Sequence, residues 1–139
     1  MIKEISKYIA DNTSLVLGST LFIGTSPATL RSKHVILKET GGDADFFLPD
    51  LSRRTLQVLA FGKDYHEAKA YADDIHALIN GMANRVLTGI GVGVDDILID
   101  TCVTMSLPAH IGQNEEQLHI FSSNYLITTQ DAQNDQLSP

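Results

Sequence analysis

The sequence predicts one α+β domain: a mostly antiparallel or mixed sheet of about five strands, with two helices packed on one face. Three observations support this prediction. The 139 residues suit a single domain, and 43% of them are hydrophobic, which is enough to form a core. Residues 65–80 repeat apolar side chains at helical spacing. Residues 97–107 and 118–129 instead alternate as strands do.

The first half of the chain predicts a helix followed by three strands. A short helix is expected over residues 2–10, because one face of it is apolar. That face holds Ile2, Ile5, Tyr8 and Ile9. Strands are expected at 20–24, 34–39 and 55–62, which are rich in β-branched and aliphatic residues. The stretch 41–45 combines glycine and aspartate and is expected to be a turn or loop.

A second helix is predicted over residues 65–78 or 65–80. Asp64 is a favourable N-cap residue, and Glu67 three positions later completes a capping-box pattern. The apolar side chains at helical spacing are Tyr65, Ala68, Ala72, Ile75 and Ile79. The Asn-Gly pair that follows is a stop signal.

The remaining segments complete the order α-β-β-β-α-β-β over residues 1–129. Residues 85–87 fit either a short strand or a final helical turn. The glycine-rich stretch 88–93 fits a flexible loop or a hairpin arm. A polar connection is expected at 108–116, between the two long strands, and residues 130–139 are expected to be a polar, disordered tail.

The predicted strands carry apolar residues on both of their alternating faces. In the third strand, Leu56 and Val58 face one way, while Leu59 and Phe61 face the other. The two helices cover one face of the sheet. The other face needs a cover too, because burying each aliphatic or aromatic side chain is worth about 1.5–3 kcal/mol. Two covers fit the sequence: neighbouring copies of the chain, or loops such as 41–53 folded back over the sheet.

Charge is distributed unevenly along the chain. Residues 1–40 hold five Lys or Arg and three acids, whereas the residues after Arg85 hold seven acids and no Lys or Arg. Binding to a phosphate backbone requires clustered cations, so this acidic part does not predict nucleic-acid binding. It fits an ordinary solvated surface, or a surface past which nucleic acid slides without binding.

No motif predicts catalysis or a cofactor, and the chain is not expected to be an enzyme. The glycine run at 89–93 lacks the spacing and the Gly-Lys-Ser/Thr ending of nucleotide loops. Asp43 and Asp45 are too few ligands for a calcium loop. Cys102 is the single cysteine; in a strand pattern it is expected to be a buried, unreactive thiol.

The histidines do not predict a metal site. His66 and His76 lie on the second predicted helix, about 15 Å apart along its axis, and cannot share a metal ion. His110 and His119 flank the connection between the long strands and would meet only through folding. Neither a signal peptide nor a membrane span of about 18 apolar residues is expected, which favours a protein of the cytoplasm.

Four stretches together resemble a known family. They are Leu-Phe-Ile-Gly-Thr-Ser-Pro at 21–27, the strand ending in a double glycine at 34–42, the strand 56–62 with its following helix, and the pair 108–112 and 119–125. In order and spacing they are similar to small minor capsid and tail-terminator (tail-completion) proteins of long-tailed phages. Residues 88–96 have no equivalent in that family.

The resemblance implies a virion assembly protein with a sheet, helices on one side and no catalytic residues. Such proteins form a homo-oligomeric ring, usually a hexamer, that caps the tail tube, stops its growth and joins tail to head. The implied partners are further copies, the tail-tube protein and head-completion or neck proteins, while DNA passes through without specific binding. The implied location is the host cytoplasm during assembly and then the tail or neck of the virion.

Two stretches, 41–53 and 88–96, are predicted to be the loops that contact other subunits or the tail tube, because both are punctuated by glycine and lack periodicity. Their candidate contact residues are Gly41, Gly42, Asp43, Asp45, Arg53, Arg54, Gly89, Gly91, Gly93, Asp95 and Asp96. Deleting either loop is expected to leave a folded chain that does not assemble.

Two alternative functions stay open on the sequence. A head–tail connector, or neck adaptor, would also form a ring but would bind the portal instead of the tail tube. A small ligand-binding domain or enzyme would need a pocket with convergent polar groups.

Overall fold

The computed structural model describes residues 1–26, 32–44, 51–94 and 96–131. Two helices and six strands follow one another along these residues: α1 (Ile2–Asn12), β1 (Leu21–Ile23), β2 (His34–Ala44), β3 (Leu51–Gly62), α2 (Tyr65–Ile79), β4 (Ala83–Leu87), β5 (Ile97–Gln113) and β6 (His119–Asp131). The described strands form one sheet in the order β1-β2-β3-β6-β5-β4. β1 runs parallel to β2, and every other neighbouring pair is antiparallel.

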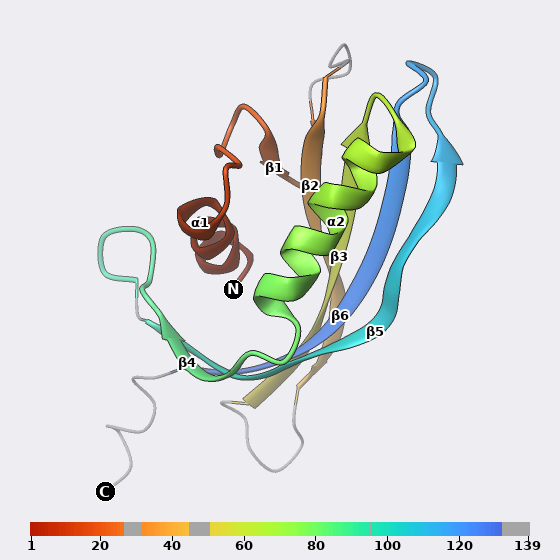
Figure 1. Ribbon diagram of the computed structural model, residues 1–139. Coiled ribbons are helices and arrows are strands. Elements are labelled where there is room, and N and C mark those ends of the chain that lie inside the picture. Colours follow the sequence, from red (N-terminus) through yellow and green to blue (C-terminus); the bar gives the residue numbers. More distant parts are fainter. Residues whose placement is uncertain (27–31, 45–50, 95, 132–139) are drawn as a thin grey trace, which may run out of the picture.

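The sheet curls around both helices, which lie on its inner face (Figure 1). The predicted α+β class and the placing of two helices on one face are therefore confirmed. The core between the layers is apolar because both helices repeat aliphatic residues on the side that meets the sheet. The helices contribute Ile5, Ile9, Ala68, Ala72, Ile75 and Ile79 to this core. The central strands contribute Val35, Leu37, Leu56, Val58, Tyr125 and Ile127.

The ends of α2 follow the local signals in the sequence. The Asp64 carboxylate accepts a hydrogen bond from the backbone N–H of Glu67 at 2.8 Å. The Glu67 carboxylate in turn accepts from the backbone N–H of Lys63 at 3.1 Å. At the other end, the N–H of Asn80 donates to the carbonyl of His76 at 3.0 Å. These contacts satisfy backbone groups that a helix end otherwise leaves unpaired.

The turn predicted at 41–45 is wrong over its described part. β2 continues through the glycines to Ala44 and pairs with β3, so that Gly42 faces Arg54 and Asp43 faces Arg53. The register shifts between Glu39 and Gly42, and Gly41 has a φ of +100° there. The glycine therefore marks a β-bulge, which needs a backbone conformation that other residues rarely adopt.

The polar connection predicted at 108–116 is also mostly strand. β5 continues to Gln113 with repeated register shifts against β6. Pro108 is tolerated there because it lies in the register shift between Ser106 and Ala109, where it has no partner in the register with β6. The connection itself is short: the Asn114 side chain accepts from the N–H of Leu118 at 2.9 Å, and Gln117 has a φ of +62°.

β4 adds a sixth described strand to the predicted five. Residues 85–87 belong to it, so the strand alternative for this stretch is correct and the helical turn is wrong. β4 pairs with the beginning of β5, with Leu87 opposite Ile97. The glycine-rich stretch between them is therefore the tip of a hairpin. Of the tail predicted at 130–139, Gln130 and Asp131 are the last residues of β6, and residues 132–139 lie outside the described residues.

A close approach between β3 and α2 explains why a glycine ends β3. A Cβ atom added to Gly62 would lie 2.5 Å from the backbone N of Ala68. We expect Gly62→Ala to lower the free energy of unfolding by about 1–3 kcal/mol, the usual cost of overpacking. Urea denaturation measures the change. An unchanged midpoint would show that α2 can move away from β3 at no cost.

Candidate assembly surfaces

The outer face of the sheet is better sheltered than the sequence predicts. Ile36, Phe61 and Leu118 are buried together there, with half-buried apolar neighbours around them. The ring of His34 stacks on that of Phe61 with centroids 4.3 Å apart, and burial lowers the pKa of His34. Around this cluster the chain's own residues therefore provide part of the cover that the sequence calls for. The described part of 41–53 does not fold over the face, because it is the stem of the β2–β3 hairpin.

Large exposed apolar side chains instead gather at the edges of the sheet, first along β5. β4 covers only the beginning of β5, with its last contact at Thr101. Next, the N–H of Thr104 donates to the Asn80 side chain at 3.0 Å. Beyond that point no described strand lies outside β5. The exposed side chains of this β5 edge patch are Val103, Met105, Leu107 and Ile111. Leu107 is 66% exposed, unusually wet for a large apolar residue.

A second apolar patch lies at the opposite edge, on β1. It consists of the exposed side chains of Val16, Leu17 and Ile23, and we call it the β1 edge patch. Its turn is held in place by the carbonyl of Val16, which accepts from the N–H groups of Thr20 at 2.9 Å and Leu21 at 3.0 Å. The β1 and β5 edge patches lie at opposite sides of the fold, with α2 between them (Figure 1).

The third exposed feature is the hairpin tip between β4 and β5, residues 88–94, which we call the arm. The N–H of Gly89 donates to the Asp96 carboxylate at 2.9 Å and closes its base. Val92 at the tip is 107% exposed, so it contributes nothing to the core. Gly91 and Gly93 have φ values of +119° and +75°. The two glycines thus provide the turn that presents Val92 to solvent.

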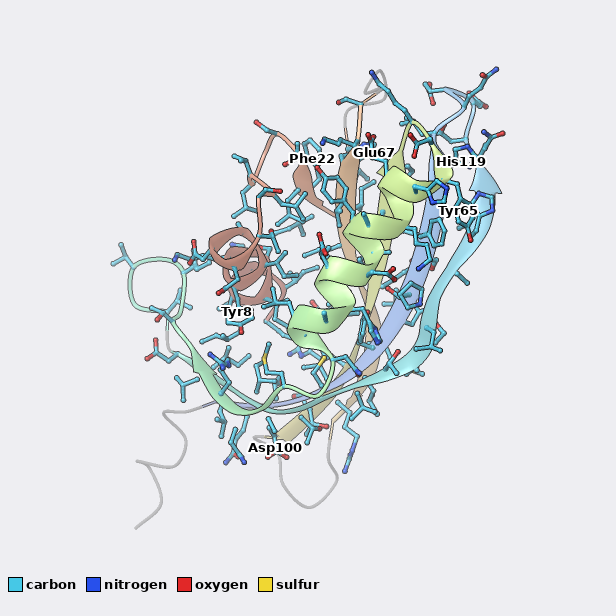
Figure 2. All side chains as sticks on the ribbon, in the orientation of Figure 1. Tyr8, Phe22, Tyr65, Glu67, Asp100 and His119 are labelled. Atoms are coloured by element: carbon cyan, nitrogen blue, oxygen red, sulfur yellow. The ribbon has the colours of Figure 1, made fainter. Side chains whose placement is uncertain are left out.

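The arm begins beside a hollow between α1 and β4. Its lining residues are Glu4, Lys7, Tyr8, Asp11, Arg85, Val86, Leu87 and Thr88. The Arg85 guanidinium lies 5.2 Å from the centroid of the Tyr8 ring. Figure 2 shows Tyr8 extending from α1 towards this hollow. The Lys7 ammonium and the Asp11 carboxylate are paired at 2.8 Å. The charged side chains that line the hollow are thus largely engaged in contacts within the chain.

The two predicted contact segments leave the same end of the sheet, where β2 and β4 end and β3 and β5 begin. In the β2–β3 stem, Arg54 forms an ion pair with Glu39. Arg54 is therefore a part of the stem. Asp45 and Asp95 lie outside the described residues. Sequence reasoning placed most of the β5 edge patch in a strand, but missed its exposure because the sequence does not show that β4 covers only the beginning of β5.

His110 and His119 meet at the opposite end of the sheet. Nε2 of His110 lies 3.1 Å from Nδ1 of His119, and Nε2 of His119 lies 3.0 Å from the Gln113 amide nitrogen. The ring of Tyr65 at the start of α2 contacts both imidazoles (Figure 2). This cluster ties the β5–β6 hairpin to α2. Among the described residues, no group of three or more His, Cys, Asp or Glu is placed to hold a metal ion.

Cys102 is buried, as the sequence predicts. Burial raises the pKa of its thiol to about 12, so the protonated, unreactive form dominates at neutral pH. We expect a thiol reagent at pH 8 to modify the folded chain at least about a hundredfold more slowly than the chain in denaturant. Following the released chromophore measures both rates. Equal rates would show that β5 opens readily around Cys102.

Comparison with known proteins gives one family and a shared fold. A model of the family described as bacteriophage tail terminator protein matches residues 8–131. A chain from the virion of a native gene transfer agent particle is 14% identical, with a TM-score of 0.63 over 93% of this chain and 91% of that chain. A second solved chain is 16% identical and reaches a TM-score of 0.47 over 90% of this chain and 88% of that one. No curated protein matches the chain. Among the described residues, no helix is long and apolar enough to cross a membrane.

Proposed function

This chain belongs to the bacteriophage tail terminator family, and from that membership we propose that it forms a homo-oligomeric ring, a hexamer, on the end of a phage tail tube. The ring ends tube growth and joins the tail to the head. The protein is then a structural component of the virion without catalytic activity, assembled in the host cytoplasm. The observation that carries the proposal is the family match over residues 8–131, which spans nearly all of the described fold.

The exposed apolar surfaces support a subunit that is buried on several sides. A monomer rarely leaves contiguous large apolar side chains wet, and such patches mark places where proteins meet. Here they lie at two opposite edges of the sheet and on the arm. A ring subunit needs contacts on two sides for its neighbours and at one end for the tube. The arrangement thus provides enough surfaces for the proposed assembly.

We assign the end of the sheet that carries the arm and the β2–β3 stem to contacts with the tail tube. The arm projects Val92 beyond the fold and its glycines allow it to adapt to a partner. The acidic second half of the chain supports passage of DNA through the bore without binding, because its carboxylates repel phosphates.

Electron microscopy of the purified protein, alone and with tail tubes, tests this proposal. We expect closed rings in the first sample or at tube ends in the second, and tubes of uniform length when the protein is present during tube growth. Tubes that grow on past the protein would contradict it. Rings that bind a portal but not a tube would instead identify a head–tail connector.

A further inference from the structure

We infer that neighbouring copies in the ring meet edge to edge: the β5 edge patch of one copy packs against the β1 edge patch of the next. The contact is made by side chains and does not extend the sheet from one copy into the other. This inference rests on the proposed ring and adds how its subunits recognise each other.

The first argument is the position of the two patches. The β1 edge patch lies at one end of the sheet order, and the β5 edge patch lies on the next-to-last strand, around and beyond the end of the part that β4 covers, so one copy presents two different surfaces. A contact between two different surfaces is heterologous, and it generates a ring when the rotation between copies closes. A contact between two identical patches would stop at a dimer. The separation of the patches therefore favours a second copy as the occupant of each.

The second argument is that neither edge offers a usable row of backbone groups. The register of β5 shifts between Thr104 and Ser106, between Ser106 and Ala109, and between His110 and Gly112. Pro108, in the same stretch, has no N–H. Bulges and proline are the usual features that prevent one strand from adding to another. Packing of the exposed side chains is the contact that this edge still allows.

The β1 edge is blocked in a different way. The N–H of Leu21 donates to the carbonyl of Val16 at 3.0 Å, and the carbonyl of Leu21 accepts from Gly18 at 2.9 Å. The carbonyl of Ile23 accepts from the N–H of Thr25 at 3.0 Å. The chain's own turns thus occupy three outward backbone groups of this three-residue strand. Its apolar side chains remain available for a neighbour.

The third argument is charge. Residues 12–30, which contain the β1 edge patch, carry no charged side chain, but the neighbouring strand β2 follows exposed Lys33 and carries Lys38. The part that contains β5 holds no Lys or Arg, and exposed Glu115 follows its end. The cations beside the β1 edge attract the carboxylate beside the β5 edge of another copy, whereas two β5 edges would repel. Complementary charge therefore favours the pairing of unlike edges.

Cysteine cross-linking tests the pairing directly. We would prepare Leu17→Cys and Leu107→Cys separately and oxidise them alone and as an equal mixture, both as free rings and on tail tubes. Because Cys102 is buried, it does not interfere. We expect disulfide-linked dimers when the mixture is oxidised, and far fewer of them when either variant is oxidised alone. Dimers of Leu107→Cys alone, or rings without any cross-link in the mixture, would overturn the inference.

Charge substitutions give a second, independent measurement. We expect Val16→Asp and Leu107→Asp each to lose the oligomer, because each destroys one of the two unlike surfaces. Mixed together, they retain one intact pair and should form a dimer that grows no further, as measured by analytical ultracentrifugation. Rings that persist in both variants would overturn the edge pairing and leave the proposed function standing. Wild-type protein that neither forms rings nor caps tubes would instead refute the function itself.

Discussion

Removal of residues 90–94 should leave a folded chain that no longer caps tail tubes. These residues form the tip of the arm, above the hydrogen bond between Gly89 and Asp96 that closes its base. The shortened loop would still join Leu87 to Ile97 with four residues, a common hairpin length. None of the removed residues belongs to the described core clusters, although Ile90 is half-buried. We expect an unchanged denaturation midpoint and overlong tubes in electron micrographs.

A single substitution in the arm distinguishes the loss of its contact with the tail tube from the effect of shortening the loop. Val92→Asp adds a carboxylate at the tip of the arm, and we expect it to abolish capping without a measurable change in stability. Ala70→Glu adds the same charge on the exposed side of α2 and should cap normally. Uniform tubes with the shortened arm would show that the arm does not contact the tube. The same deletion across 41–53 is less informative, because it would remove paired residues of β2 and β3.

Replacement of Ile75 by alanine should lower the free energy of unfolding by about 2–5 kcal/mol. Ile75 is fully buried in the middle of the layer between α2 and the sheet. The loss combines the transfer of the removed methyl groups with the cavity that they leave, because packed neighbours relax only partly. Against a typical stability of about 5–15 kcal/mol, this is a large fraction.

Urea denaturation measures this change, and a neighbour on the same helix provides its control. Asp74 is exposed, and we expect Asp74→Ala to change the free energy by less than about 0.5 kcal/mol. Ile75→Val should lie between the two, at about 0.5–1.5 kcal/mol. Equal effects of Ile75→Ala and Asp74→Ala would contradict the packing of α2 described above.

The helices could be predicted because their signals are local. The spacing of Ile5 and Ile9 places both on one face, whatever the rest of the chain does. Asp64 and Glu67 define the start of α2 through contacts that span a few residues. Runs of β-branched and aliphatic residues also predicted the beginnings of β1, β2, β5 and β6 to within one residue, whereas β3 begins at Leu51, four residues before its predicted start. Burial of the single thiol of Cys102 followed from the strand pattern around it.

The ends of β2 and β5 were not predictable, because they depend on partners far along the chain. Gly41 and Gly42 have the composition of a turn, yet pairing with β3 holds them in a bulged strand. The stretch that starts at Pro108 has the composition of a connection, yet pairing with β6 makes it part of β5 as far as Gln113. The hydrogen bonds gained by pairing across the sheet outweigh the local conformational preference of these residues. The partner strand lies far away in the sequence, so a short stretch of sequence does not reveal it.

The sequence by itself determined the class of fold, both helices and a resemblance to phage tail terminators, since these depend on composition, spacing and order. Only the tertiary structure decided which apolar side chains remain exposed to solvent. The outer face of the sheet, which alternation alone predicts to be exposed, is sheltered around Phe61. Most of the exposed large apolar residues lie at the β5 and β1 edges and on the arm instead. Exposure depends on which strand ends up outermost, and that is a property of the whole sheet, not of any one strand.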